Sequence, residues 1–228
     1  MRRYDAIFIS PNLDDAVLSC GATIAKLINI GKRVLVVTVF SKGTSNIHTK
    51  CARQYLGSYD KNCRAFFSLR KKEDAKASSI LGYDVLHLDF VEAPFRGDRG
   101  KPYYPEDVYG QILTDDLYNI STVTTSLNNI VTAKLKVDEG VIYLPLGLGG
   151  HVDHRLVRLA AKELNIDRKR IYYWEDYPYF QHGNYRGNQE LYQSSVLAKA
   201  VNVNAFVKLK LIAIAQYQSQ LEGLNNYK

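Results

Sequence analysis

Residues 33–40 read RVLVVTVF, a run of β-branched and other apolar residues in which polar and apolar positions do not alternate. Such a run is typical of a strand that is buried on both faces. Residues 5–9, DAIFI, form a shorter apolar run, and apolar residues recur at helical spacing between residue 14 and Gly31. A strand, a helix and a strand in this order indicate parallel strands with a right-handed crossover. We therefore expect a Rossmann-like α/β fold, a three-layer sandwich around a mostly parallel sheet.

Further strands and helices are predicted along the rest of the chain. Short apolar runs predict strands over residues 84–88, 140–144 and 171–174. Helical spacing predicts helices over residues 64–81, 106–118, 121–136, 153–164 and 205–221. The polar stretches 41–63 and 92–105 are expected to be loops, the first of them an active-site flap. The sequence contains no repeat, linker or low-complexity tract, so we expect residues 1–228 to form a single domain.

Composition limits the compartment and the partners. Three cysteines without a C-x-x-C pair indicate reduced thiols, and the N-terminal MRRYDAIFIS does not resemble a signal peptide, so we expect a cytoplasmic protein. No segment approaches the roughly 20 apolar residues of a membrane span. The net charge of +7 fits a solvated surface or an anionic small-molecule substrate. No nucleic-acid-binding module is recognisable, so we expect no nucleic-acid partner, and the oligomeric state stays open.

Two carboxylates follow the first predicted strand. The segment Ser-Pro-Asn-Leu-Asp-Asp ends in Asp14 and Asp15, at the start of the predicted helix. In an open parallel sheet, ligands bind at the carboxyl ends of the strands, which favours a functional site here. An alternative is structural, because an aspartate can cap a helix and interact with its dipole.

Two histidines follow a later strand. Residues 149–154, GGHVDH, contain His151 and His154 at a spacing that can place both on one helix face. An H-x-x-H pair alone is weak support for a metal site. Together with Asp14 and Asp15, however, the two histidines would face one crevice at the carboxyl ends of the strands. Asp15 and His154 then suit two zinc ligands, and Asp14 and His151 suit a base and an electrostatic stabiliser.

The motifs resemble those of a known family. SPNLDDAVLSCGATIA and PLGLGGHVDHRLV are similar to the two site motifs of the PIG-L/LmbE family of zinc-dependent N-deacetylases and amidases. One bacterial branch of this family has Ser-Pro-His-Leu-Asp-Asp as its first motif. Further segments of this chain are similar to that branch, in the same order: RKKEDAKASSILG, LDFVEAPFR, YWEDYPY and AQYQSQ. The resemblance therefore extends over nearly the whole chain.

The resemblance implies a role for each matching residue. Asp15 and His154 would be zinc ligands, Asp14 the general base that activates water, and His151 the cationic or hydrogen-bonding group that stabilises the tetrahedral intermediate. The family has a histidine as its first ligand, where this sequence has Asn12. An amide oxygen is a weak zinc ligand, so we expect zinc to be held weakly or not at all.

Three other residues are candidates for substrate binding: Arg70, Glu175 and Asp176. Arg70 would hold a substrate hydroxyl or phosphate, or form an ion pair with Asp74 on the surface of its helix. Glu175 and Asp176 follow a predicted strand and would border the pocket. The expected activity is hydrolysis of an N-acyl group, most often acetyl, on a polar or anionic amino sugar or related natural-product intermediate. The alternative is a non-hydrolytic binding protein or repurposed enzyme with a degenerate metal site.

Overall fold

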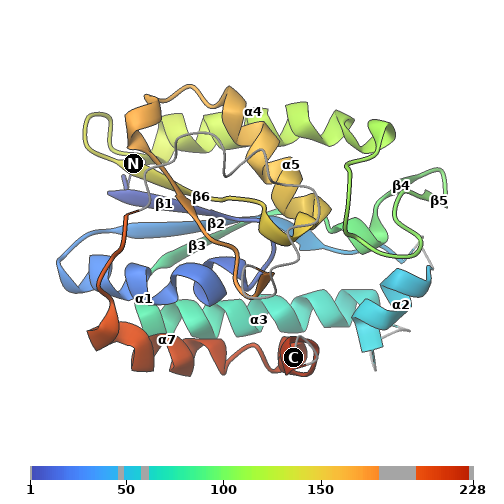
Figure 1. Ribbon diagram of the computed structural model, residues 1–228, viewed down its shortest axis with the longest axis horizontal. Coiled ribbons are helices and arrows are strands. Elements are labelled where there is room, and N and C mark those ends of the chain that lie inside the picture. The colour runs from blue at the N-terminus through green and yellow to red at the C-terminus, as the bar shows by residue number, and fades with distance from the viewer. Residues whose placement is uncertain (1, 46–48, 58–61, 180–198, 226–228) are drawn as a thin grey trace.

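Five parallel strands form the central sheet of the protein (Figure 1). The structure is a computed structural model, and it describes residues 2–45, 49–57, 62–179 and 199–225. The strands are β1 Ala6–Ser10, β2 Val34–Lys42, β3 Asp84–Val91, β6 Val141–Pro145 and β7 Ile171–Trp174, in the spatial order β3-β2-β1-β6-β7. A separate antiparallel hairpin consists of β4 Gly97–Asp98 and β5 Lys101–Pro102.

The strand order changes direction at β1. The chain runs outward from β1 through β2 to β3, and it then returns to the other side of β1 to form β6 and β7. Ligands of open parallel sheets bind beyond the carboxyl ends of the strands at such a switch point. The loops that follow β1 and β6 hold Asn12 and His151, so both residues lie beside this crevice.

Helices cover both faces of the sheet (Figure 1). One layer consists of α1 Asp15–Asn29, α3 Cys63–Leu81 and α7 Val207–Ile214, and the other of α4 Tyr118–Lys134 and α5 Val152–Ala160. The short helix α2 Lys50–Leu56 contacts the 3-10 turn Ala93–Phe95, and α8 Gln218–Asn225 contacts α3. The predicted α/β fold with a layer of helices on each face of a parallel sheet is therefore confirmed.

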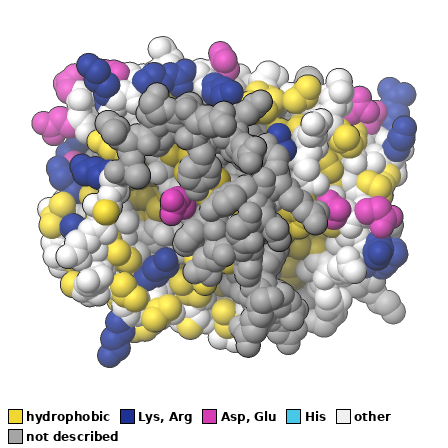
Figure 2. Space-filling model, viewed as in Figure 1, with side chains coloured by type: hydrophobic (Ala, Val, Ile, Leu, Met, Phe, Trp, Pro, Cys, Tyr) yellow, Lys and Arg dark blue, Asp and Glu magenta, His cyan; other side chains and the backbone are white. Residues whose placement is uncertain are grey.

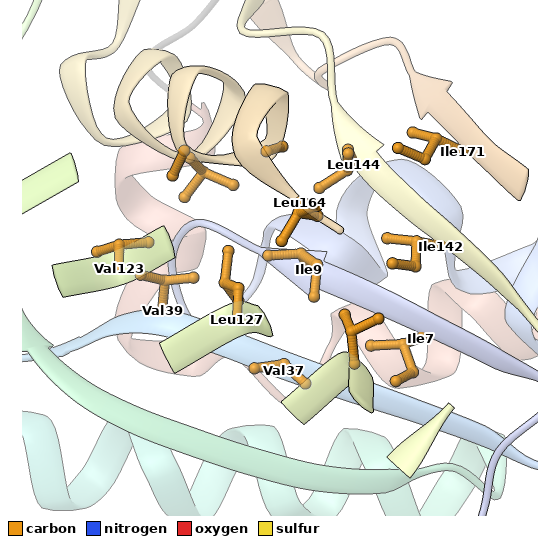
Figure 3. Packing of buried hydrophobic residues seen from close by; sticks show 14 of the residues in the cluster. Ile7, Ile9, Val37, Val39, Val123, Leu127, Ile142, Leu144, Leu164 and Ile171 are labelled. Atoms are coloured by element: carbon orange, nitrogen blue, oxygen red, sulfur yellow. The ribbon is translucent and has the colours of Figure 1, made fainter. Parts of the chain in front are cut away.

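Side chains of β1 alternate between the two helical layers. Ile7 and Ile9 belong to the apolar cluster under α4 and α5, where they lie near Leu127 (Figure 3). Ala6 and Phe8 belong to the opposite cluster under α1 and α3. Burial of each Ile or Phe contributes about 1.5–3 kcal/mol. Burial on both faces therefore explains why the predicted strands contain apolar runs rather than alternating patterns.

Three predicted segments differ from the structure. The helix expected over 106–118 is wrong: residues 108–110 instead hydrogen-bond to the loop before α5, and only Thr114–Asp116 form a 3-10 turn. The buried Val108 packs against Val152 in that contact. Its apolar side chain therefore serves a contact with another loop and does not mark the face of a helix. Within the loop expected over 41–63, residues 50–56 form α2. The helix expected over 205–221 is interrupted between α7 and α8.

Basic side chains are spread over the visible surface. Figure 2 shows Lys and Arg side chains at several separate places around one face of the molecule. This distribution agrees with a solvated surface better than with a single anion-binding patch on that face. In the part of the chain that the structure describes, no helix combines the length and the apolar character needed to cross a membrane.

Asp5 joins the start of β1 to two other segments. Its Oδ2 accepts the backbone N–H of Arg33 at 2.9 Å, and its Oδ1 accepts from Lys136 Nζ at 2.6 Å. Burial alone would raise the pKa of Asp5, but the hydrogen bonds from Lys136 and Arg33 outweigh it and the pKa is lowered. The ionised form of Asp5 is therefore favoured by folding.

We predict that Asp5→Asn lowers the free energy of unfolding by about 1 kcal/mol at pH 7. Because the folded-state pKa lies below the unfolded value, this contribution is present above about pH 4 and disappears as the pH falls through the folded-state value. Urea denaturation at several pH values measures it. Asp138→Asn, at an exposed position in the same loop as Lys136, is the control. A stability loss independent of pH would contradict the role of the Asp5 charge.

Candidate active site

The loop after β1 is held in a fixed turn by side-chain hydrogen bonds. The Ser10 hydroxyl accepts from the backbone N–H of Ala16 at 3.0 Å and donates to the carbonyl oxygen of Asn12 at 2.6 Å. The backbone N–H of Asn12 donates to Asp15 Oδ2 at 2.8 Å. The turn brings Asn12, Asp14 and Asp15 to the start of α1, where all three are buried and line one cavity.

The loop after β6 approaches the same cavity. Gly149 has a positive φ, and a Cβ there would lie 2.5 Å from Cβ of Tyr179, so this close approach requires glycine. His151 then caps α5, because its Nδ1 accepts the backbone N–H of Asp153 at 3.2 Å. The ring of His154 lies 5.2 Å from that of His151, measured between centroids. The structure therefore brings both predicted histidines to the carboxylates of the first loop.

His154 lies between two carboxylates. Its Nδ1 is 2.6 Å from Asp176 Oδ1, and its Nε2 is 3.2 Å from Asp15 Oδ2. The second oxygen of Asp176 accepts the backbone N–H groups of Gly147 and Leu148 at 2.8 and 3.0 Å. Asp176 thereby fixes the orientation of the His154 ring, with Nε2 toward Asp15.

Neither acidic residue after β7 lies in the position expected for substrate binding. Asp176 is completely buried behind His154, and Glu175 is exposed. Among the described residues that line the cavity, neither is present. Neighbouring residues that leave a strand point to opposite sides, which directs Glu175 to solvent and Asp176 to the histidine. Neither residue therefore borders this cavity, and Asp176 instead supports His154 from behind.

Asp153 connects Asn12 to a buried network of charges. Its Oδ2 accepts from Asn12 Nδ2 at 3.1 Å and from the backbone N–H of Ala93 at 3.2 Å, and its Oδ1 accepts from Arg96. Arg96 also donates to both oxygens of Asp116, at 2.9 Å from Nε and 2.8 Å from Nη2. Because Asp153 uses the amide nitrogen of Asn12, the amide oxygen is the atom left to face a cation.

Arg70 is buried beneath Asp14. Its guanidinium donates to Glu92 Oε1 at 2.6 Å and lies 3.7 Å from Asp14 Oδ1. The hydroxyl of Tyr55 accepts from Arg70 and donates to Glu92. The positive charge is thus shared between an interior carboxylate and the candidate base, and it holds Asp14 in place.

The predicted alternative for Arg70, a surface ion pair with Asp74, is wrong. Each of these two side chains is 1% exposed. Asp74 instead accepts from the Tyr217 hydroxyl at 2.7 Å and lies 2.7 Å from His87 Nε2. Helix α3 lies between the sheet and the C-terminal segment. The sides of the helix that carry Arg70 and Asp74 are therefore both covered.

Burial shifts the pKa values of the two predicted catalytic residues. Burial raises the pKa of Asp14 to about 6, with Arg70 opposing the shift and the negative charge of Asp15 adding to it. Burial also lowers the pKa of His151 to about 4. His151 is therefore neutral near pH 7, and since its Nδ1 accepts a hydrogen bond, the proton is on Nε2. Of the two forms expected for His151, the structure favours the neutral hydrogen-bond donor.

The site fits a metal ion in part. Within the described residues, no three His, Cys, Asp or Glu side chains group closely enough to hold one. His154 nevertheless has the features of a ligand: its buried Nε2 faces Asp15 across 3.2 Å, and its Nδ1 is held by Asp176. A zinc-binding histidine usually donates its other N–H to a carboxylate in this way. With Asp15, two strong ligands are present, and Asn12 supplies only an amide beside them.

Asp14 and His151 line one cavity of about 1080 Å³. Its walls come from α3, from residues 106–109, from residues 177–179 and from the C-terminal residues 215–220. This volume is slightly above the usual range of about 300–1,000 Å³ for small-molecule sites. The cavity therefore has room for a ligand larger than one sugar ring.

A family model with the description GlcNAc-PI de-N-acetylase, PIG-L, matches residues 7–165, which is more than half of the chain. The chain belongs to the PIG-L family. The matched region contains both site loops, from Asn12 to His154, so the family resemblance of the two motifs is confirmed. Asp176 and the C-terminal wall of the cavity lie outside the matched region of this PIG-L protein.

Named relatives of this PIG-L protein act on acetylated natural products. It is 28% identical to 2'-N-acetylparomamine deacetylase of Niallia circulans over 96% of this chain and 81% of the relative. A deacetylase–teicoplanin complex from teicoplanin biosynthesis matches with a TM-score of 0.78 and 26% identity, over 94% of this chain and 87% of the other. A zinc-inhibited form of teicoplanin deacetylase has a TM-score of 0.76 at 23% identity, over 96% and 86%, and shows the shared fold.

Several buried residues of the site had no role in the sequence-based prediction. Asp153 lies between the two histidines of GGHVDH, and its position inside the motif was the available signal. Glu92 follows β3 directly, so it shares the strand-end position of the predicted site residues. Arg96 is the last residue of the LDFVEAPFR segment that resembles the family, but only the fold shows its contact with Asp153.

The Arg96 network generates a stability prediction. We expect Asp116→Ala to lower the free energy of unfolding by about 3 kcal/mol, because it removes one of the two carboxylates that balance a buried guanidinium. Urea denaturation followed by circular dichroism measures the change. Asp115→Ala, at the exposed neighbouring position, should change stability by less than about 0.5 kcal/mol. Equal effects of the two substitutions would show that the network does not stabilise the fold.

Proposed function

We propose that this protein hydrolyses an N-acetyl group on an amino sugar or on an amino-sugar-containing natural product. The observation that carries the proposal is the placement of Asp14 and His151 in one cavity, beside the Asp15–His154 pair. This arrangement offers a carboxylate that can move a proton and an N–H that can face a developing oxyanion. The names of 2'-N-acetylparomamine deacetylase and of the teicoplanin deacetylase support the acyl group and the substrate class.

In this proposal, Asp15, His154 and Asn12 would hold a zinc ion. When bound, the ion would polarise the acyl carbonyl and acidify water. The support from this chain is the buried Nε2 of His154, which lies 3.2 Å from Asp15 Oδ2, with Asp176 behind the ring. Asn12 would contribute its amide oxygen, because Asp153 holds its amide nitrogen.

Asp14 is the general base of the proposed reaction. It would accept a proton from the attacking water and return it to the departing amine. Arg70 orients the carboxylate from the interior, and Glu92 and Tyr55 in turn hold Arg70. This support holds the Asp14 side chain from the interior side, while the side chain lines the cavity.

His151 would stabilise the tetrahedral intermediate as a neutral donor. Its Nδ1 accepts the N–H of Asp153, so Nε2 carries the hydrogen that would face the oxyanion. The ring of Tyr109 contacts the His151 ring edge-on at 5.6 Å, and Tyr179 lies 6.5 Å away. These rings restrict the rotation of the imidazole, and they line the same cavity as His151.

The cavity favours a substrate with hydrogen-bond donors and positive charge. Apart from Glu73, whose two oxygens both accept from Ser219, the described residues that line it include more acidic side chains than basic ones: Asp14, Asp15, Glu106 and Asp107 against Arg70 and Lys76. Arg70 is already paired with Glu92. Such a lining attracts cations and repels anions. We therefore propose a neutral or cationic amino sugar rather than the anionic substrate that the net charge suggested.

A second candidate function is non-hydrolytic binding of the same ligand class. The observation that favours it is Asn12, which leaves Asp15 and His154 as the only two strong zinc ligands of the described site. Such a protein would keep the cavity but hold too little metal for catalysis. Metal content and acetate release separate the two candidates.

We predict that Asn12→His raises the zinc content from less than one ion per chain to nearly one. An imidazole binds zinc far better than an amide does, and Asp153 can accept its second N–H as it now accepts that of Asn12. Affinity should increase by about 10–100-fold or more. Metal analysis after dialysis against a chelator measures the change. Acetate release from 2'-N-acetylparomamine should increase with the metal content.

Two further substitutions in the Asn12→His protein serve as controls. Asp14→Ala should keep the zinc and lose the activity, whereas His154→Ala should lose both. If the unmodified protein already holds one zinc that resists the chelator, Asn12 is an adequate ligand and the site is not weakened. If Asn12→His binds zinc tightly and releases no acetate from amino sugars, the non-hydrolytic candidate is favoured.

A further inference from the structure

Glu73 on α3 holds the backbone at the start of α8. Its Oε1 accepts the N–H of Ser219 at 2.9 Å, and its Oε2 accepts from the Ser219 hydroxyl at 2.6 Å. Glu73 is only 3% exposed. The first N–H groups of a helix lack intrahelical partners and carry partial positive charge, so a carboxylate is well placed there. Both oxygens of Glu73 are engaged by one residue of the C-terminal segment.

The segment that Glu73 holds forms one wall of the cavity. Its residues that line the cavity are Ala215, Gln216, Gln218, Ser219 and Gln220. Tyr217 points the other way: it is 1% exposed and donates to Asp74. Two successive carboxylates of α3 therefore anchor the segment, Asp74 on the side away from the cavity and Glu73 on the cavity side.

The same helix holds the candidate base. Arg70 lies three residues before Glu73, which places both side chains on one face of α3. Arg70 contacts Asp14, and Glu73 contacts Ser219. About one turn of α3 therefore contacts both Asp14 and the C-terminal wall, and it fixes their positions relative to each other.

The wall presents hydrogen-bond acceptors. The side chains of Gln216, Gln218 and Gln220 each donate through Nε2 to an oxygen within residues 212–219. Their amide oxygens, together with the second N–H of each amide, are then the groups that can bind a ligand. Acceptors of this kind suit the hydroxyl and ammonium groups of a sugar or aminocyclitol ring.

We propose that Glu73 is a positioning residue for substrate, and that residues 215–220 form the subsite for the ring attached to the acetylated sugar. The inference rests on the proposed deacetylase function. Glu73 acts through Ser219 and the backbone of the segment, and it makes no contact with the reacting atoms. Its loss should therefore weaken binding of a two-ring substrate and leave the chemical step intact.

Kinetics test the role of Glu73 in the full chain with Asn12→His. Glu73→Ala should raise KM for 2'-N-acetylparomamine about tenfold, with kcat changed by less than about twofold and little change for N-acetylglucosamine. Ser219→Ala, which keeps the backbone contact, should raise KM by about threefold. Unchanged KM in both variants overturns the proposal. Ser219→Ala also keeps the test decisive if Glu73→Ala fails to fold.

Two variants separate positioning from other roles. Glu73→Gln retains an acceptor for the Ser219 N–H and gains a donor to its hydroxyl, so KM should stay within about threefold of the parent value. If Glu73→Gln is as damaging as Glu73→Ala, the charge contacts substrate directly and the positioning role is overturned. Lys72→Ala, at the exposed position next to Glu73 and outside the cavity lining, should leave KM unchanged. An equal rise of KM in Lys72→Ala would show a general effect of changing α3 and would also overturn the specific role.

Hydrogen exchange provides a measurement without substrate. In the unmodified full chain, the amides of residues 216–221 should exchange slowly, and Glu73→Ala but not Glu73→Gln should speed their exchange. Unchanged exchange in Glu73→Ala overturns the contact itself. If exchange responds as expected but no variant deacetylates any amino sugar, the proposed function fails. The subsite role is then overturned with it, while the Glu73–Ser219 contact stands as a structural one.

Discussion

The parallel pairing of β1 with both β2 and β6 is the constraint on which the site depends. Ala6, Ile7 and Phe8 pair with residues of both neighbouring strands, so the loops after β1 and β6 leave the sheet next to each other. The Asn12–Asp153 hydrogen bond joins residues that are 141 positions apart in the sequence. A register shift of one residue would turn the β1 side chains toward the opposite helical layer and separate the two loops.

Paired charges beneath the cavity give the site its rigidity. Arg70 and Arg96 each contact two carboxylates, and each also lies against an aromatic ring, with Arg96 only 4.8 Å from the centroid of Phe40. A buried ion without partners costs several kcal/mol, so these contacts are needed for folding before any chemistry occurs. The same contacts orient Asp14 and Asp153. Groups oriented in advance need little rearrangement as charge develops during a reaction.

The sequence was informative where a pattern is local. The β-branched run of β2 and the strand-end motifs around Asp14 and His154 predicted the sheet and the convergence of the two loops. The partners of Arg70 could not be predicted, because Glu92 and Tyr55 reach it only through the packing of α2, α3 and β3. The segment around Val108 misled for a related reason: its apolar residues pack against another loop rather than along a helix face. Local spacing does not reveal which distant segment a side chain will meet.

The contact between Asn12 and Asp153 has an evolutionary consequence. Asp153 accepts an N–H group, and an amide and an imidazole can both supply one. Asp153, Arg96 and Asp116 can therefore keep the same contacts whether asparagine or histidine stands at position 12. Codons for asparagine and histidine differ only in their first base. The contacts that support stability therefore do not depend on which of the two residues stands at position 12, and Asn12 is one point mutation from a histidine.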